Sequence, residues 1–168
     1  MRQASSGTIW LAFSAALGTV PSCASSGMTP QMSAVIPSHA TGVKLKSSLP
    51  PAELYAHTYR FLRDKGFRFT EANESMTSLS TEGMAVGKSE IQLRIDLVIA
   101  RADSGSVLSA TADYLLTPGN WRPVAYRDSG TKYKVGFEEL ALLMQQLPHD
   151  GEIQYTVDED RSRRAFSF

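Results

Sequence analysis

The side chains able to do acid–base or metal chemistry are few and scattered along this sequence. The chain contains three histidines, which lie far apart at His39, His57 and His149. None of them has a second candidate ligand at a spacing that a helix or a hairpin would bring together, so we expect no metal site. The sequence also lacks a Gly-x-Ser-x-Gly nucleophile motif, and Gly105 has no partner glycines to form a phosphate-binding loop.

Two pairs of carboxylates are the other candidates for catalysis. Glu71 and Glu74 flank an expected turn, and Asp96 and Asp113 are expected to face each other across a hairpin. Glycoside hydrolysis needs two carboxyl groups about 5–10 Å apart in a cleft. The same strand faces also carry hydroxyl groups and Arg94, a mixture typical of an ordinary solvated sheet surface. We therefore expect no enzymatic activity and no cofactor, and an envelope hydrolase ranks third among the functions considered.

A long connection, residues 117–134, is the best candidate for a binding element. Loops of this length in compact domains are often functional, and aromatic and arginine side chains are favoured at interface hot spots. The candidate partner-binding residues are Trp121, Arg122, Tyr126, Arg127 and Tyr133. The alternative is structural: Trp121 and Tyr126 pack over the open end of the domain, and the basic groups reach outward to solvent. The sequence leaves both interpretations open.

Cys23 is the only cysteine, so the chain cannot form an internal disulfide or a cysteine-based metal centre. It is preceded by a short positive region at Arg2 and by an apolar stretch of twelve residues, 9–20. That stretch is shorter than the roughly 20 residues that a membrane-spanning helix requires. The order of these features predicts an export signal over residues 1–22.

The residues that end this signal, Val20-Pro21-Ser22-Cys23, resemble the lipobox of bacterial lipoprotein precursors. Val20 and Ser22 fit that motif, whereas Pro21 stands where a small or hydroxylated residue is usual. The resemblance implies cleavage before Cys23 and acylation of this cysteine, which would anchor the chain to a membrane. In a Gram-negative cell, Ala24 implies the periplasmic side of the outer membrane. A plain secretory signal and a buried N-terminal helix with an inert cysteine are the alternatives.

Two stretches of polar composition are expected to lie outside the folded domain. Residues 23–50 begin with the lipidated cysteine and continue with many Ser, Gly, Pro and Thr residues without apolar periodicity, which predicts a mostly flexible tether. Val43 and Leu45 could add a short edge strand at its end. Residues 158–168 mix acidic and basic side chains and are predicted to form a solvated polar tail.

Two helices are predicted from apolar residues at helical spacing. The first covers residues 51–65, with Ser48 or a nearby residue as its cap, prolines in its first turn and Gly66 as its stop. The second covers residues 136–147 and ends at Pro148. Each presents one apolar face, so each must pack on another layer.

The clearest periodicity in the chain is that of strands. Apolar and polar residues alternate over 91–99 and again over 107–116, and the turn Asp103-Ser104-Gly105 joins these strands into a long hairpin. Shorter strands are predicted at three further places: 67–70, 77–81 and, as a short C-terminal strand, 153–157.

These elements predict one α+β domain over residues 51–157. Two helices would cover one face of an antiparallel sheet of about four strands, a two-layer sandwich in the order α-β-β-β-β-α. The order of the elements and the segment Gly66-Phe67-Arg68-Phe69 resemble small envelope lipoprotein domains, such as those of outer-membrane assembly machinery. A resemblance of fold carries little functional information.

The charge balance limits the class of partner. Lys and Arg number 17, as do Asp and Glu, so the formal net charge is zero and the basic excess of a nucleic-acid-binding protein is lacking. The sequence favours a non-enzymatic, membrane-anchored envelope protein that binds another envelope protein or a cell-wall polymer. The second-ranked function is a module that binds a small apolar or lipid ligand between helices and sheet. A dimer through an unpaired strand edge is a further alternative.

Overall fold

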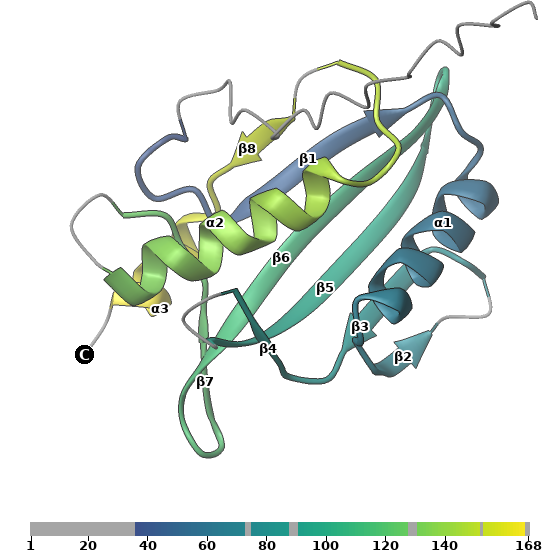
Figure 1. Ribbon diagram of the computed structural model, residues 1–168. Coiled ribbons are helices and arrows are strands. Elements are labelled where there is room, and N and C mark those ends of the chain that lie inside the picture. Colours follow the sequence, from purple (N-terminus) through teal and green to yellow (C-terminus); the bar gives the residue numbers. More distant parts are fainter. Residues whose placement is uncertain (1–35, 73–74, 88–90, 128–130, 152, 167–168) are drawn as a thin grey trace, which may run out of the picture.

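The computed structural model describes residues 36–72, 75–87, 91–127, 131–151 and 153–166, with backbone only for residues 131–133. In this part of the chain, eight antiparallel strands form one sheet that three helices accompany (Figure 1). The strands are β1 (Gly42–Ser47), β2 (Phe69–Ala72), β3 (Ser78–Thr81), β4 (Met84–Val86), β5 (Ile91–Ala102), β6 (Gly105–Thr117), β7 (Asn120–Pro123) and β8 (Gln154–Thr156). The helices are α1 (Pro51–Asp64), α2 (Thr131–Gln145) and α3 (Glu159–Phe166).

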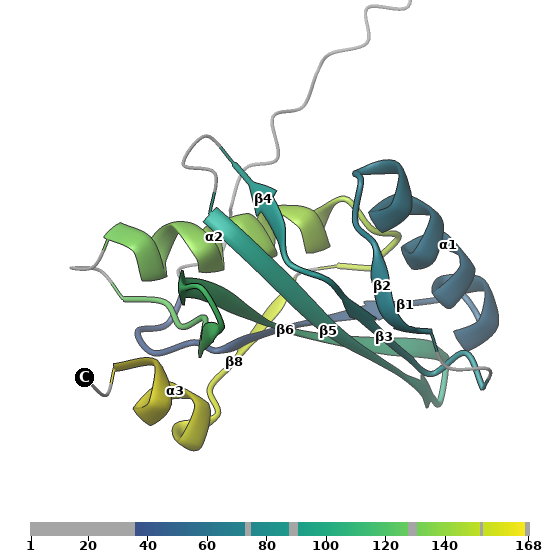
Figure 2. The same cartoon turned by 90° about the horizontal axis from the view of Figure 1, so that it is seen from below.

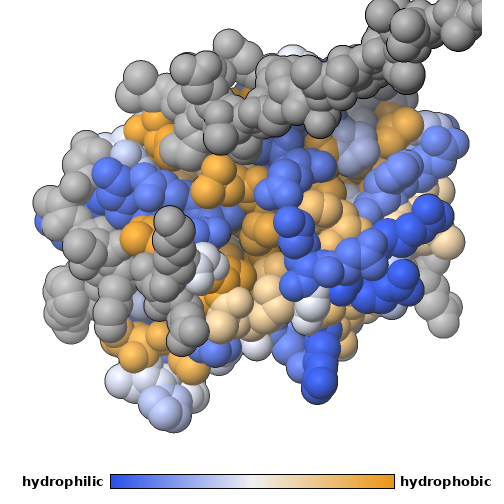
Figure 3. Space-filling view, in the orientation of Figure 1, coloured by the Kyte–Doolittle hydropathy of each residue, from blue (hydrophilic) through white to orange (hydrophobic). Residues whose placement is uncertain are grey.

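The sheet is built around the long hairpin of β5 and β6. The hydrogen-bonded path runs β2-β3-β5-β6-β1-β8, and off this path β4 pairs with β5 and β7 pairs with β6. Helices α1 and α2 cover one face, and α3 lies on the opposite face at one end of the sheet (Figure 2). We call this opposite face the open face. On the helix-bearing side, apolar surface lies between α1 and α2, and hydrophilic residues cover the outer side of α1 (Figure 3).

The predicted central hairpin is confirmed. From Leu93↔Tyr114 to Ala102↔Gly105 the two strands pair without interruption, so side chains opposite each other share a face. The face toward the helices is apolar and at most 2% exposed: Leu93, Ile95, Leu97, Ile99, Leu108, Ala110, Ala112 and Tyr114. Burying one such large aliphatic side chain contributes about 1.5–3 kcal/mol, which makes this hairpin the centre of the hydrophobic core.

Helix α1 confirms the predicted helix of residues 51–65 to within one residue. Its buried face consists of Leu54, Thr58 and Leu62, and Pro51 occupies its first turn. Gly66 follows with φ of +97°, a conformation that glycine adopts without steric cost. The predicted cap is wrong, because the N-cap residue is Pro50 and no side chain caps the helix.

Helix α2 begins at Thr131 rather than at the predicted Gly136. The predicted apolar stripe is confirmed, because all of its members are at most 9% exposed: Phe137, Leu140, Leu143, Met144 and Leu147. Residues 131–135 precede this stripe, so the apolar periodicity gave no indication of the extra turn. The stretch 117–134 is therefore not one long loop, since it contains β7 and the first turn of α2.

The predicted sheet of about four strands with two helices is wrong. The four predicted strands exist, as β2, β3, β5 and β6, and the suggested C-terminal strand exists as β8. The structure adds β1, β4 and β7 to the sheet and α3 to the helices. Strands β4 and β7 have three and four residues, which is too short for an alternating pattern to stand out from the surrounding chain.

The predicted tether is wrong for its last part, because residues 42–47 form β1. The strand suggested at Val43 and Leu45 therefore exists, but it lies between β6 and β8 rather than at an edge of the sheet. This strand pairs along its whole length with β6 and, over Gly42–Lys44, also with β8. Val43 and Leu45 are each 1% exposed, and Ile36 and Ala40 before the strand are also buried. Two apolar residues among Ser, Thr and Lys are a weak signal, and the neighbouring strands supply the stability that the local composition lacks.

The predicted solvated tail is wrong for residues 159–166, which form α3. Ser162 and Ala165 are buried against the sheet, and acidic residues begin the helix while Arg163 and Arg164 end it. This charge order complements the helix dipole. A helix of eight residues is not stable alone in water, so it depends on its contacts with the open face.

The register of the hairpin can be tested with a matched pair of substitutions. We expect Ile95→Asp, which places a carboxylate in the core, to lower the free energy of unfolding by more than about 3 kcal/mol. Val98→Asp on the open face, where Val98 is 55% exposed, should change it by less than about 1 kcal/mol. Urea denaturation followed by circular dichroism measures both. Equal stability of the two variants would contradict the assignment of the faces.

Candidate functional site

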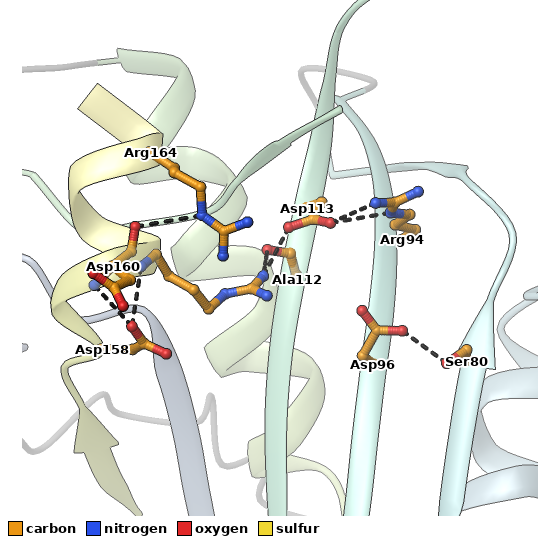
Figure 4. Close-up of polar contacts among 9 residues, drawn as sticks. Ser80, Arg94, Asp96, Ala112, Asp113, Asp158, Asp160 and Arg164 are labelled. Atoms are coloured by element: carbon orange, nitrogen blue, oxygen red, sulfur yellow. Dashed lines mark hydrogen bonds and ion pairs between the residues drawn. The ribbon is translucent and has the colours of Figure 1, made fainter. Parts of the chain in front are cut away.

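One end of the open face carries an arginine–aspartate cluster, formed by Arg94, Asp113 and Arg161. Arg94 lies opposite Asp113 in the β5–β6 register and donates from Nε and Nη2 to its Oδ2 atom at 3.1 and 2.7 Å. Arg161 of α3 donates from Nη2 to Oδ1 of Asp113 at 2.7 Å and to the carbonyl oxygen of Ala112 at 3.0 Å. Figure 4 shows Asp113 between β5 and α3. Both carboxylate oxygens thus accept hydrogen bonds, and Asp113 as a whole residue is only 8% exposed.

The predicted pairing of Asp96 with Asp113 is wrong. Asp96 stands opposite Thr111, one row further along the hairpin, and accepts a hydrogen bond of 2.8 Å from Ser80 Oγ (Figure 4). The two carboxylates therefore have separate partners. Because two arginines bind Asp113, it is not free to act as a nucleophile or a general base.

Trp121 of β7 lies across this end of the open face. The guanidinium of Arg94 is 4.9 Å from the centroid of its ring, within the range of a cation–π contact. The far edge of the indole lies against Gly83, between β3 and β4, so closely that a Cβ at Gly83 would overlap it. An indole from β7 thus reaches the β3–β4 connection, which shows that this end of the sheet is curled.

A polar groove lies beside Trp121 on the open face. Its volume is about 470 Å³. It is lined by Thr70, Glu71, Ser80, Thr81, Glu82, Gly83, Arg94, Asp96 and Trp121. Asp113 is shared between Arg94 and Arg161 and offsets only part of the charge of Arg94, but the groove lining holds three carboxylates, Glu71, Glu82 and Asp96, against this one arginine. The groove therefore favours ligands that bring positive charge or hydrogen-bond donors.

The predicted partner-binding residues have different roles. Trp121 lines the groove. Arg122 and Arg127 hold α3 in place: Nη1 of Arg122 donates to the carbonyl oxygen of Arg164 at 3.2 Å, and Arg127 lies 5.2 Å over the ring of Phe166. Tyr126 packs on Phe137 of the core, with 6.0 Å between ring centroids. The side chain of Tyr133 lies outside the described residues, as does Cys23.

Helix α3 begins with a side-chain cap at Asp158. Its carboxylate accepts hydrogen bonds from the backbone N–H groups of Arg161 and Asp160, at 3.0 and 2.9 Å. The bond from Arg161 is the main reason that the pKa of Asp158 lies below its ordinary value. The N–H of Asp158 in turn donates to Oγ1 of Thr41 at 2.8 Å, which ties the helix to the start of β1.

The three histidines do not converge. His39 lies against Phe166, His57 is exposed on α1, and Nδ1 of His149 is 2.8 Å from the carbonyl oxygen of Leu147 at the end of α2. Within the described ranges, no group of three or more His, Cys, Asp or Glu side chains is arranged to hold a metal ion.

Sequence reasoning missed most of the groove. Ser80 and Glu82 come from β3 and the residue after it, and neither was a candidate. Arg161 lies 48 residues after Asp113 in a stretch predicted to be a tail. No local pattern could have joined them, since only the docking of α3 on the sheet brings these residues together.

The central role of Asp113 leads to a prediction. Asp113→Asn leaves two guanidinium groups beside a neutral amide, and we expect it to lower the free energy of unfolding by about 2–3 kcal/mol, because Arg94 and Arg161 are partly buried. Asp96→Asn, which weakens one hydrogen bond to Ser80, should cost less than about 1 kcal/mol. Urea denaturation of both variants is the measurement. A smaller effect for Asp113 than for Asp96 would refute this account.

Comparison with known proteins does not assign this chain to a family. A scan against protein-family models and a search of curated proteins find no match to the chain. Across the described residues, no helix is both long and apolar enough to cross a membrane.

Proposed function

We propose that this protein is a non-enzymatic binding module, held at a membrane by lipid on Cys23, which captures an envelope partner in the polar groove of its open face. The observation that supports this proposal is the polar groove. Two of its charged groups are already held in place before any partner arrives, Arg94 by its bonds to Asp113 and Asp96 by its bond from Ser80. Preorganised side chains of this kind lose little conformational entropy on binding.

The lipid anchor rests on the sequence of the first 23 residues, which lie outside the described part of the chain. Cys23 is 13 residues before Ile36, the first described residue (36 − 23 = 13). A fully extended chain spans at most about 3.3–3.6 Å per residue, so these residues reach at most about 47 Å. The domain would thus stay near the membrane and act on partners found there.

A binding role fits the groove better than a catalytic one. The most buried carboxylate of this region, Asp113, has both oxygens occupied by arginines. The groove is open to solvent, and Glu71 and Glu82 are exposed. Acid–base catalysis depends on carboxylates or histidines shielded from water in a cleft, whereas exposed carboxylates on a rigid sheet suit electrostatic recognition.

The alternative of an apolar ligand between the helices and the sheet receives less support. Large side chains from both layers fill this space and are less than 2% exposed, among them Leu54, Leu62, Ile95, Phe137 and Met144. A ligand in that position would have to displace well-packed core residues, at a cost of several kcal/mol.

The anchor can be tested by one substitution. If Cys23 carries the lipid, Cys23→Ala should move the protein from the membrane fraction to the soluble fraction, because the acyl chains supply the membrane affinity. Intact mass spectrometry of the wild-type membrane fraction should show a chain that begins at Cys23 with added acyl mass. Equal membrane retention of the variant would rule out the anchor.

The binding role can be tested in the source organism with a photoreactive phenylalanine derivative at Thr70, which lines the groove and is exposed. Irradiation should give a discrete adduct whose mass identifies a protein or a polymer. The control places the same residue at Asp103, in the exposed turn between β5 and β6. No adduct from Thr70, or the same adduct from both positions, would exclude the groove as the binding site.

A further inference from the structure

Strand β2 ends the sheet and has a described partner on one side only. It pairs with β3, and the hydrogen-bonded path across the sheet begins with it. Thr70, Glu71 and Ala72 are all exposed. In Figure 1, β2 lies at the margin of the sheet near α1. An edge of this kind offers backbone N–H and C=O groups to an added strand.

The two sides of this edge differ in chemistry. On the open face, Glu71 stands opposite Ser80 and lines the polar groove together with Asp96. The groove lining holds three carboxylates, Glu71, Glu82 and Asp96, against the single positive charge of Arg94, so negative charge dominates. The open-face side of the edge therefore attracts basic side chains.

The helix-bearing side of the edge carries an aromatic ladder, formed by Tyr55, Tyr59 and Phe69. The rings of Tyr59 and Phe69 are stacked with 4.5 Å between centroids, and those of Tyr55 and Tyr59 with 6.4 Å. All three side chains are partly exposed. Partial burial, and to a smaller extent the proximity of Tyr59, raises the pKa of Tyr55 above its ordinary value. This ladder favours apolar side chains.

We propose that β2 accepts a short extended segment of a partner polypeptide in which basic and apolar residues alternate. Successive side chains of a strand point to opposite faces, so the basic ones would reach Glu71 and the groove and the apolar ones would reach Tyr59 and Phe69. The backbone of the segment would pair with β2. This inference rests on the proposed function and names its partner as a protein segment.

The same charges disfavour a second copy of this chain as the occupant. Two β2 edges paired through a two-fold axis would place both Glu71 carboxylates on the same face, close to each other. The edge is also short, with four residues and an irregular register between Phe69 and Glu71. Such an edge limits pairing to a short segment and protects against continuous edge-to-edge assembly.

The probe is an eight-residue peptide of alternating lysine and valine, acetylated, amidated and labelled for fluorescence anisotropy with the full chain. We expect it to bind at least about tenfold more tightly than the glutamate–valine peptide of the same length. Two methylated peptides are compared, one with the lysine nitrogens and one with the valine nitrogens methylated. The set whose N–H groups point toward β2 should abolish binding when methylated, because that edge can then no longer be paired. Equal affinity of the two charge types, retained affinity of both methylated peptides, or no binding at all would overturn the proposal.

Variants of the chain locate the interaction. Glu71→Lys should weaken binding of the lysine peptide at least about tenfold, and Glu71→Gln by an intermediate factor, whereas Asp103→Lys, another exposed acid, should leave it within about twofold. Thermal melting checks that each variant is folded. Unchanged affinity in both Glu71 variants would place the peptide elsewhere. A protein adduct from Thr70 without peptide binding would leave the binding role standing and remove strand addition.

Discussion

The uninterrupted pairing of β5 with β6 is the constraint on which the rest of this structure depends. It decides that Leu93 and Ile95 face the helices and that Arg94 faces the opposite side. A slip of one residue would exchange the two faces and place charges in the core. The core, the polar groove and the arginine–aspartate cluster are consequences of one backbone register, so the stability of the fold and the geometry of the candidate site have a common origin.

The same hairpin shows how far prediction from the sequence extends. Its strands, its buried face and its turn follow from alternation over many residues. The cross-strand pairing of polar residues does not, because it depends on the length of the turn. The pair Ala102↔Gly105 leaves two residues in the turn, and counting back from it places Asp113 opposite Arg94 and Thr111 opposite Asp96. The expected pairing of Asp96 with Asp113 would require a register shifted by two residues.

The remaining errors share one physical cause. β1, β4, β7 and α3 are short segments whose stability comes from their neighbours and not from their own composition. A sequence pattern reports burial only over several periods, and these elements have three at most. The candidate site is built partly from them: Trp121 from β7 and Arg161 from α3 complete what β5 and β6 begin. Trp121, the aromatic residue of the candidate site, could be named from the sequence, whereas the residues that surround it could not.

The position of β1 has a mechanical consequence. Hydrogen bonds hold the segment before it at two residues. The N–H of Thr41 donates to the carbonyl oxygen of Thr156, and its Oγ1 accepts from the N–H of Asp158. The N–H of His39 donates to the carbonyl oxygen of Tyr126. A pull on the chain from its N-terminal side therefore acts on an interior strand of the sheet, since β1 lies between β6 and the edge strand β8. Tension directed along the strand loads all of these bonds at once, so they must break together. An attachment at this end would hold the domain under strain that would peel away an edge strand.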